Sequence, residues 1–190
     1  MKHGMRWILI LLFISSGATA QQLKTKNLII VTIDGYRWEE LFEGAAPKLL
    51  SDSRYTRQAE VRLLFTGSSE TERRKKLMPF MWSMIAQKGQ LYGNRNFNNK
   101  VNCSNHHLLS YPGYSEMLVG FPARGVSSND KSENPNATVL EFIHKQEGFH
   151  NEVAAFATWD VFPYILREEK ANLHVHAGED LALGKISDHE

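Results

Sequence analysis

Three polar residues stand where they could do chemistry: Asp34, Ser110 and Asn129. Ser110 is followed by Tyr-Pro-Gly and then by residues that favour a helix. A hydroxyl at a helix N-terminus lies beside free backbone amides, which attract anions. Such a serine becomes a nucleophile when a general base or a metal ion activates it. The simpler alternative is that Ser110 only caps the helix.

Asp34 and Asn129 are the other two candidates. Asp34 directly follows an apolar run, so its carboxylate is expected to be partly buried, and a buried carboxylate needs a partner or a metal ion. Alternatively, Asp34 is a turn residue that caps the next helix. The Asn129 amide could donate to a developing oxyanion, or it could belong to an ordinary turn. Because no Gly-x-Ser-x-Gly motif surrounds Ser110, its pattern favours metal activation over a lipase-type mechanism.

The segments around these residues are expected to alternate between strands and helices. Residues 28–33 form a continuous apolar, β-branched run, which is typical of a strand buried on both faces. Asp34 would then lie at the carboxyl end of that strand, where open α/β sheets bind ligands. Further strands are predicted over 90–95, 151–159 and 172–178, and a loop or lid over 43–70. Helices are predicted over 38–42, 72–89, 113–119, 134–146 and 161–170. Pro79 would lie in the first turn of the helix over 72–89, and Asn136 or Thr138 would cap the helix over 134–146. The alternation predicts an α/β domain with a mainly parallel sheet flanked by helices.

Residues 1–20 have the pattern of a secretory signal peptide. Lys2 and Arg6 precede a short apolar run, and Ala18 and Ala20 give the A-x-A pattern of a cleavage site. The apolar run is too short to span a bilayer, and no second run of that kind follows it. We therefore expect cleavage after Ala20, a folded domain over residues 21–190, no membrane span, and a secreted or periplasmic protein.

Length and composition indicate one ordinary globular domain. The chain has 190 residues, of which 42% are hydrophobic and 23% are charged. The formal net charge of +1 argues against nucleic-acid binding, which usually needs a basic surplus. Cys103 is the only cysteine, so the chain has no internal disulfide, and we interpret Cys103 as a small apolar residue rather than a nucleophile.

The order of these motifs resembles the alkaline phosphatase superfamily, and within it the nucleotide pyrophosphatase/phosphodiesterase branch. That branch has an apolar strand ending in Asp-Gly, followed by the pattern TFPNHYxxxTGxxPxxHGxxxN. Here the corresponding segments are IIVTIDGYRWEELF and SYPGYSEMLVGFPARGVSSN. Ser110 matches the nucleophilic threonine, and Asn129 matches the oxyanion-binding asparagine. Pro112 and Gly120 match the family's proline and glycine.

Two departures from the family pattern bear on substrate specificity. Tyr114 replaces a histidine of the family, and the PxxHG motif is shortened to Pro122 through Gly125. The resemblance covers residues 27–178 and is closest to secreted Bacteroidetes-type alkaline phosphatase family proteins. Those proteins have counterparts of NDKxxNPNxTVLEF and AAFATWDVFPYI.

The resemblance implies a zinc-dependent phosphoesterase, a phosphodiesterase or phosphomonoesterase acting on a phosphate-ester small molecule or a nucleotide. Two zinc ions would clamp the attacking and leaving oxygens. Asp34 and Ser110 would bind the same zinc ion, and Ser110 would form a covalent phospho-enzyme. Asn129 would hold a non-bridging phosphate oxygen.

The family's remaining metal ligands have no counterpart before Glu190, so we expect an N-terminal part of the domain, apparently truncated at its C-terminus. Two alternatives stay open. One is an inactive truncated relative or a non-catalytic exported binding protein. The other is a sulfate- or phosphonate-ester hydrolase on the same fold, although Ser110 lacks the C/S-x-P-x-R context of sulfatases.

Other groups that contain histidine are weaker candidates. His174 and His176 flank one residue of a predicted strand, so both side chains should point to one face, either as a metal pair or on a partly exposed edge strand. The remaining groups are His106 with His107, as substrate contacts or surface residues, and Asp188 with His189, as a metal pair.

Overall fold

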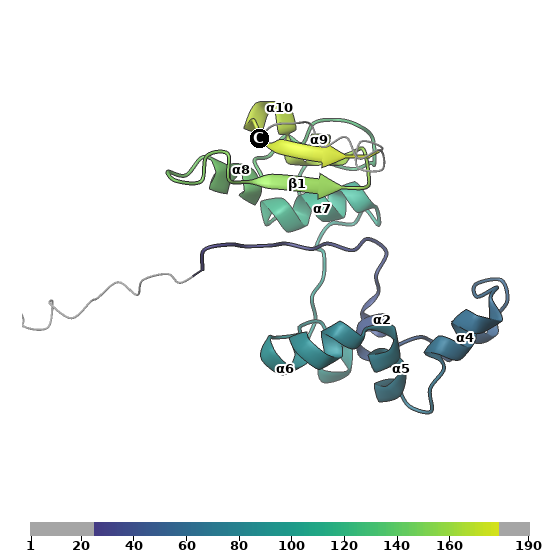
Figure 1. Ribbon diagram of the computed structural model, residues 1–190. Helices are drawn as coiled ribbons and strands as arrows, with labels where there is room; N and C mark the ends of the chain where they lie inside the picture. The colour runs from purple at the N-terminus through teal and green to yellow at the C-terminus, as the bar shows by residue number, and fades with distance from the viewer. Residues whose placement is uncertain (1–24, 179–190) are drawn as a thin grey trace, which may run out of the picture. The chain divides into compact units, whose positions relative to one another are not determined.

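The structure is a computed structural model, and it describes residues 25–178 of the chain (Figure 1). The proposed signal peptide and the Asp188–His189 pair lie outside these residues. Within 25–178, no helix is long and apolar enough to cross a membrane.

Residues 28–33 do not form the predicted buried strand. The segment belongs to a separate unit that ends at Ile33, and no helix or strand is assigned to it. Its apolar side chains are open to solvent, with Ile29 83% and Val31 79% exposed. The prediction was wrong because a β-branched run becomes a strand only when a neighbouring strand accepts its backbone hydrogen bonds. Among the described residues, no strand pairs with this run.

The next part of the chain, residues 38–97, is helical (Figure 1). α2 contacts α5, α5 contacts the π-helix η1, and η1 contacts α6. α3 packs against α4, and α4 packs against α5. The elements are α2 (Trp38–Phe42), α3 (Pro47–Ser51), α4 (Ala59–Phe65), α5 (Glu70–Leu77), η1 (Met81–Ile85), α6 (Ala86–Lys88) and the 3₁₀ turn η2 (Arg95–Phe97).

Trp82 joins α2 to this helical part. Its indole N–H donates to the Leu41 carbonyl at 3.0 Å, and its ring meets the Phe42 ring edge to face at 6.3 Å. The Arg74 guanidinium lies 3.8 Å from the centre of the Trp82 ring and donates to the Phe42 carbonyl. These contacts combine aromatic packing with a cation–π interaction, and they fix α2 against α5 and η1.

Three sequence predictions are corrected in this region. Residues 43–70 hold α3 and α4 rather than a loop or lid, and residues 90–95 form no strand. The predicted helix over 72–89 is interrupted, because Pro79 follows the end of α5 instead of lying in a first turn. Proline lacks the amide that the helix needs and disfavours helical geometry in the preceding residue, which explains a break at Met78. Gly89 ends the helical stretch as predicted.

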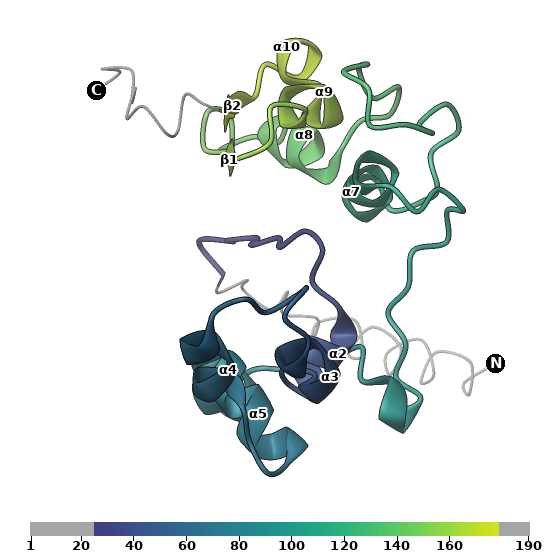
Figure 2. The ribbon, with the colours of Figure 1, turned by 90° about the vertical axis from the view of Figure 1, so that its right-hand side faces the viewer.

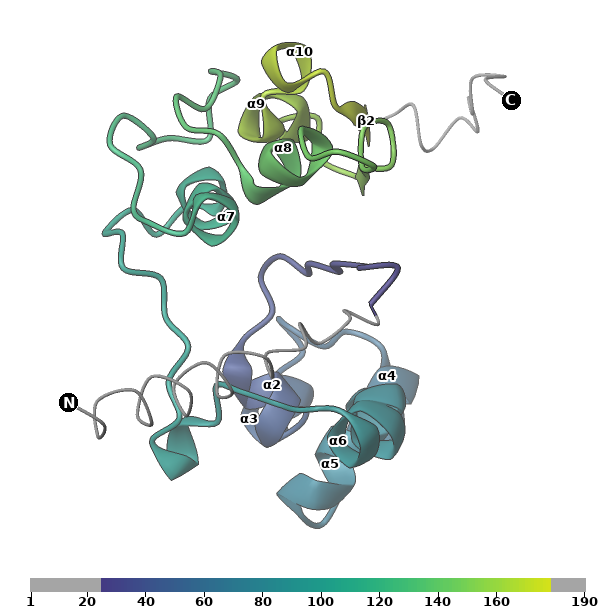
Figure 3. The same ribbon diagram turned by 90° about the vertical axis from the view of Figure 1, so that its left-hand side faces the viewer.

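The following part of the chain, residues 104–178, is a layered α/β arrangement. β1 (Ala154–Ala157) and β2 (His174–Ala177) pair in parallel, with Ala154 opposite His174 and Phe156 opposite His176. Figures 2 and 3 show α8 and α9 on one side of this sheet, with α7 beyond them. The helices are α7 (Ser110–Val119), α8 (Val139–His144), α9 (Phe162–Leu166) and α10 (Glu168–Ala171). The predicted strands over 151–159 and 172–178 are confirmed as these two strands, although both are only half-buried.

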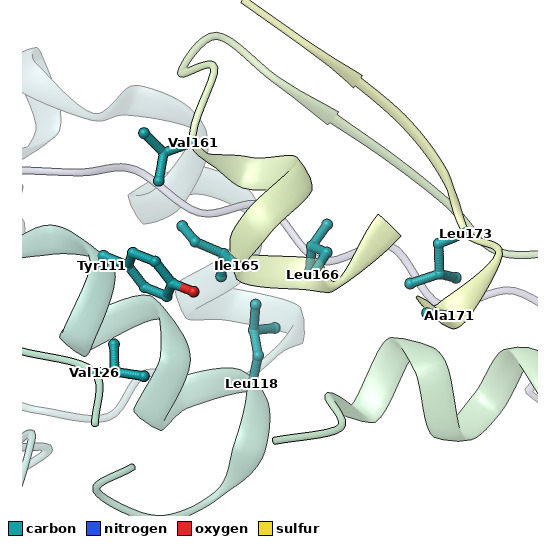
Figure 4. Close-up of a cluster of buried hydrophobic side chains, with 8 residues drawn as sticks. All are labelled: Tyr111, Leu118, Val126, Val161, Ile165, Leu166, Ala171 and Leu173. Carbon is teal, nitrogen blue, oxygen red and sulfur yellow. The ribbon is translucent and has the colours of Figure 1, made fainter. Parts of the chain in front are cut away.

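The core of this part lies between α7 and α9 (Figure 4). Tyr111 and Leu118 point from α7 toward Ile165 and Leu166 of α9, and Ile165 is fully buried. Thr138, one of the two predicted caps, accepts a hydrogen bond from the Glu141 amide at 3.3 Å, and α8 is shorter than the predicted helix over 134–146. The coarse α/β prediction therefore fits residues 104–178, where helices cover a short parallel sheet.

Candidate functional site

Ser110 is the first residue of α7, which makes the helix start earlier than the predicted Gly113. Leu109 occupies the N-cap position, and its side chain makes no capping hydrogen bond. The Ser110 hydroxyl has no hydrogen-bond partner among residues 25–178. The interpretation of Ser110 as an N-cap is therefore wrong, and its hydroxyl is free of the structural task that would compete with a chemical one.

In the first turn of α7, one backbone amide has no hydrogen-bond acceptor among the described residues. The Tyr111 amide donates to the Asn129 side chain at 3.0 Å, and the Gly113 amide donates to the Leu109 carbonyl at 3.2 Å. Pro112 has no amide hydrogen. This leaves the Ser110 amide as the one first-turn donor without a backbone or side-chain acceptor among the described residues, at the positive end of the helix dipole.

Asn129 lies beside Ser110 through this hydrogen bond. Its Oδ1 atom accepts from the amide of the residue that directly follows Ser110. Because Oδ1 is the acceptor, the Nδ2 amide is the group left to donate. Asn129 is exposed, and its Nδ2 has no acceptor within residues 25–178. The structure therefore brings together a free hydroxyl, a free backbone amide and a free side-chain amide.

Tyr111 anchors this turn to the core. It is only 1% exposed, and its hydroxyl donates to the Ser132 carbonyl at 2.7 Å. Burial raises the pKa of this hydroxyl to about 12, and the nearby Glu133 carboxylate adds to the shift. The Tyr111 hydroxyl therefore stays neutral. The start of α7 is fixed by the packing of the Tyr111 ring and by the hydrogen bond from the Tyr111 amide to Asn129.

Glu116 ties the preceding loop to α7. Its carboxylate accepts hydrogen bonds from the Ser104 amide at 2.5 Å and from the Asn105 amide and side chain at 2.9 and 2.7 Å. The Ser104 amide, more than the other contacts, holds the pKa of Glu116 below its ordinary value. This arrangement fixes the chain that leads into His106, His107 and the start of the helix.

Asp34 stands apart from the other two candidates. It lies in an exposed turn with Gly35, and among the described residues it has no hydrogen-bond or ion-pair partner. The expectation of a partly buried carboxylate is wrong, because the preceding run is itself exposed. No contact described in residues 25–178 links Asp34 to Ser110 or Asn129.

The described residues do not make a zinc site by themselves. A zinc ion in a protein is held by about three or four ligands, whereas Asp34 and Ser110 are two and are not joined. No group of three or more His, Cys, Asp or Glu side chains gathers within 25–178. Cys103 is exposed rather than the buried apolar residue that we expected.

Two residues that fix the surroundings of α7 were missed by the sequence interpretation. Glu116 fixes the loop before α7, and Asn134 donates from a fully buried position to the Ser115 hydroxyl at 3.0 Å and the Ile165 carbonyl at 3.2 Å. The Asn134 contact joins α7 to α9. Its only sequence signal is the Asn-Pro dipeptide at 134–135, which predicts a turn and not a buried polar contact.

Comparisons of the chain with protein-family models, with curated proteins and with solved structures find no match.

Proposed function

We propose that the chain belongs to an exported metal-dependent phosphoesterase in which Ser110 is the nucleophile. The observation that carries the proposal is the group at the start of α7. There Ser110 presents an unpartnered hydroxyl and amide, and Asn129 is fixed beside it through the Tyr111 amide at 3.0 Å. The resemblance to the alkaline phosphatase superfamily gives these same two residues the roles of nucleophile and oxyanion donor.

The substrate is a phosphate-ester small molecule or a nucleotide. Its phosphoryl group would meet the positive end of α7, where the Ser110 amide donates to one oxygen. The Asn129 Nδ2 amide would donate to a second, non-bridging oxygen and so stabilise the charge that grows in the transition state. The Ser110 hydroxyl loses its proton to solvent and its oxygen attacks phosphorus in line. The ester oxygen leaves with its pair of electrons and takes up a proton from solvent, and the phosphoryl group remains on Ser110. Water then attacks the phosphoserine, Ser110 takes back a proton, and the product is phosphate from a monoester or a phosphate monoester from a diester.

Zinc is part of this proposal through the resemblance, with Asp34 and Ser110 as ligands from this chain. When bound, zinc lowers the pKa of a coordinated oxygen and neutralises phosphoryl charge. Two residues are fewer than the three or four ligands that a zinc site takes, so the proposal requires further ligands besides Asp34 and Ser110.

The alternatives are separable by experiment. An inactive truncated relative or an exported binding protein on the same fold would bind phosphate at the Ser110–Asn129 turn without turnover. A sulfate- or phosphonate-ester hydrolase would turn over those esters in preference to phosphate esters. Export itself depends on the signal peptide over residues 1–20, with Gln21 as the first residue of the mature, secreted or periplasmic protein.

The test compares Ser110→Ala with Ser110→Thr in the longest natural form of the protein, here called the full-length gene product, supplied with zinc. Turnover of an aryl phosphate and an aryl phosphodiester should disappear in Ser110→Ala and remain substantial in Ser110→Thr, because threonine keeps a hydroxyl. Since Ser110 caps nothing, the unfolding midpoint of both variants should match that of the wild type. Near-normal turnover by Ser110→Ala would refute the assignment.

A further inference from the structure

The two strands give the sheet one packed face and one open face. Ala155 and Val175 pack against the core cluster. Side chains alternate along a strand, so Phe156, His174 and His176 share the opposite face. Phe156 is 68% exposed, and His174 is exposed as well. No helix of residues 104–178 covers this second face (Figure 2).

Two imidazoles converge on this open face. The Nε2 atoms of His174 and His176 are 2.7 Å apart, and their rings meet edge to face with centroids 4.4 Å apart. At that distance one Nε2 carries a hydrogen and the other accepts it. Two nitrogens that bind one metal at about 2.0–2.1 Å in neighbouring positions are roughly 3 Å apart. The pair therefore already has nearly the spacing of a chelate.

Phe156 holds one of the two rings in place. Its ring stacks on the His176 ring at 5.4 Å with planes only 6° apart, and it does so because the parallel register puts Phe156 opposite His176. The residue opposite His174 is Ala154, whose small side chain leaves room beside the second imidazole. Metal-binding histidines whose orientation is fixed in advance lose little freedom when the ion arrives.

We propose that His174 and His176 chelate a divalent late transition-metal ion, with Cu²⁺ held more tightly than Ni²⁺ or Zn²⁺. Imidazole suits these ions, and the order of affinity for nitrogen ligands peaks at Cu²⁺. Neighbouring coordination positions about 90° apart, as in tetragonal Cu²⁺ complexes, fit the close Nε2 spacing better than a tetrahedron does. On binding, the shared hydrogen moves to Nδ1 of its own ring, and both Nε2 lone pairs face the ion.

This pair is an open chelate and is separate from the Ser110 turn. Two protein ligands leave the other positions of the ion to water or to a small-molecule donor. Neither histidine is among the residues assigned to phosphoester chemistry, so the proposal stands whether or not that chemistry is correct.

The test is a Cu²⁺ titration of the full chain, followed by calorimetry and by the NMR signals of the histidine rings. All proteins carry His3→Ala, because the amino-terminal Met-Lys-His is itself a nitrogen chelator of Cu²⁺. Low amounts of Cu²⁺ should erase the ring signals of His174, His176 and Phe156 before all others. His174→Ala or His176→Ala should weaken binding at least about tenfold, since the second imidazole acts at a high effective concentration.

A double variant, His106→Ala with His107→Ala, is the matched control. It removes two adjacent exposed histidines that do not share a strand face, and it should leave the affinity unchanged. The proposal is overturned if either single variant changes the affinity less than about twofold, or if the ring signals of His106 and His107 are lost first. The ring signals of the His3→Ala parent protein decide the matter even if a histidine variant fails to fold.

Discussion

Asn129 performs two tasks with two atoms of one side chain. Its Oδ1 atom accepts the Tyr111 amide at 3.0 Å and thereby caps the start of α7. Its Nδ2 atom is left to donate to a bound anion. Substitutions that keep one of these tasks and remove the other can separate the structural role from the chemical one.

Asn129→Asp and Asn129→Ala form such a pair. Aspartate keeps an acceptor for the Tyr111 amide but replaces the donor with an anionic oxygen, so we expect the helix to keep its stability. Turnover of an aryl phosphate should fall by about 100- to 1,000-fold, the usual loss for one oxyanion donor. Alanine should lose turnover and also destabilise the fold by about 1 kcal/mol, as for a lost helix cap. Thermal unfolding and kinetics of the full-length product measure both effects, and equal turnover in Asn129→Asp and wild type would contradict the donor role.

Glu116 predicts a pH dependence of the loop before Ser110. Its pKa is below the ordinary value, chiefly because the carboxylate accepts the Ser104 amide. The ionised side chain therefore stabilises the loop above the ordinary glutamate pKa, and this contribution is lost as the pH falls through the lowered pKa. The amide proton shifts of Ser104 and Asn105 should titrate together below the ordinary value. In Glu116→Gln the same shifts should stay flat, and a midpoint above the ordinary value in the wild type would contradict the account.

At the scale of elements, the features that depend on neighbouring residues in the sequence were predicted correctly. The features that depend on a distant segment of the chain were not. The Thr138 cap of α8 and the end of the helical stretch at Gly89 depend on local backbone chemistry, and both were predicted. The strand over 28–33 was wrong because pairing is a property of two segments, and its apolar pattern names no partner. The start of α7 was misplaced because Asn129, far along the chain, supplies the hydrogen bond that lets the helix begin at Ser110.

The residues of the candidate site were likewise predicted only in part. Ser110 and Asn129 were singled out from sequence, and the structure brings them together. Asp34 was predicted by its place after the apolar run, and it stays exposed because that run is unpaired. Glu116 could not be found, since its backbone partners at 104 and 105 leave no pattern in residue types.

Gly44 tests how α2 packs against α5. Its φ is +82°, and a Cβ added there would lie 2.2 Å from the Arg74 backbone nitrogen. Gly148 has nearly the same φ, +80°, with nothing within 4 Å of an added Cβ. Gly148→Ala should therefore cost only the backbone strain, about 1–2 kcal/mol. Gly44→Ala should cost at least about 2 kcal/mol more, because backbone atoms must move apart. Urea unfolding followed by circular dichroism measures both, and equal losses would show that α2 does not approach α5 so closely.

At the scale of the whole molecule, the described residues lack a complete metal centre and leave apolar surface open. Residues 28–33 expose their side chains, and a contiguous exposed apolar surface usually marks a place where something else packs.

We predict from the ligand count that the 190-residue chain binds zinc weakly and hydrolyses phosphate esters negligibly. Titration with zinc should find no tightly bound pair of ions, and turnover of an aryl phosphate or phosphodiester should stay at the background rate. Two tightly bound zinc ions per chain, together with turnover that depends on Ser110, would show that ligands have been misassigned. His174 and His176 would then be the first residues to reconsider.

The central claim is that Ser110 carries the phosphoryl group. The full-length gene product is mixed with an aryl phosphate in the presence of zinc, quenched in acid within the first turnovers, digested and analysed by mass spectrometry. The account predicts a phosphoryl group on Ser110 in the peptide that contains Tyr111 and Pro112, and its absence in Ser110→Ala. A phosphoryl group on another residue, or turnover with no phosphoryl group on Ser110 at any quench time, would contradict it.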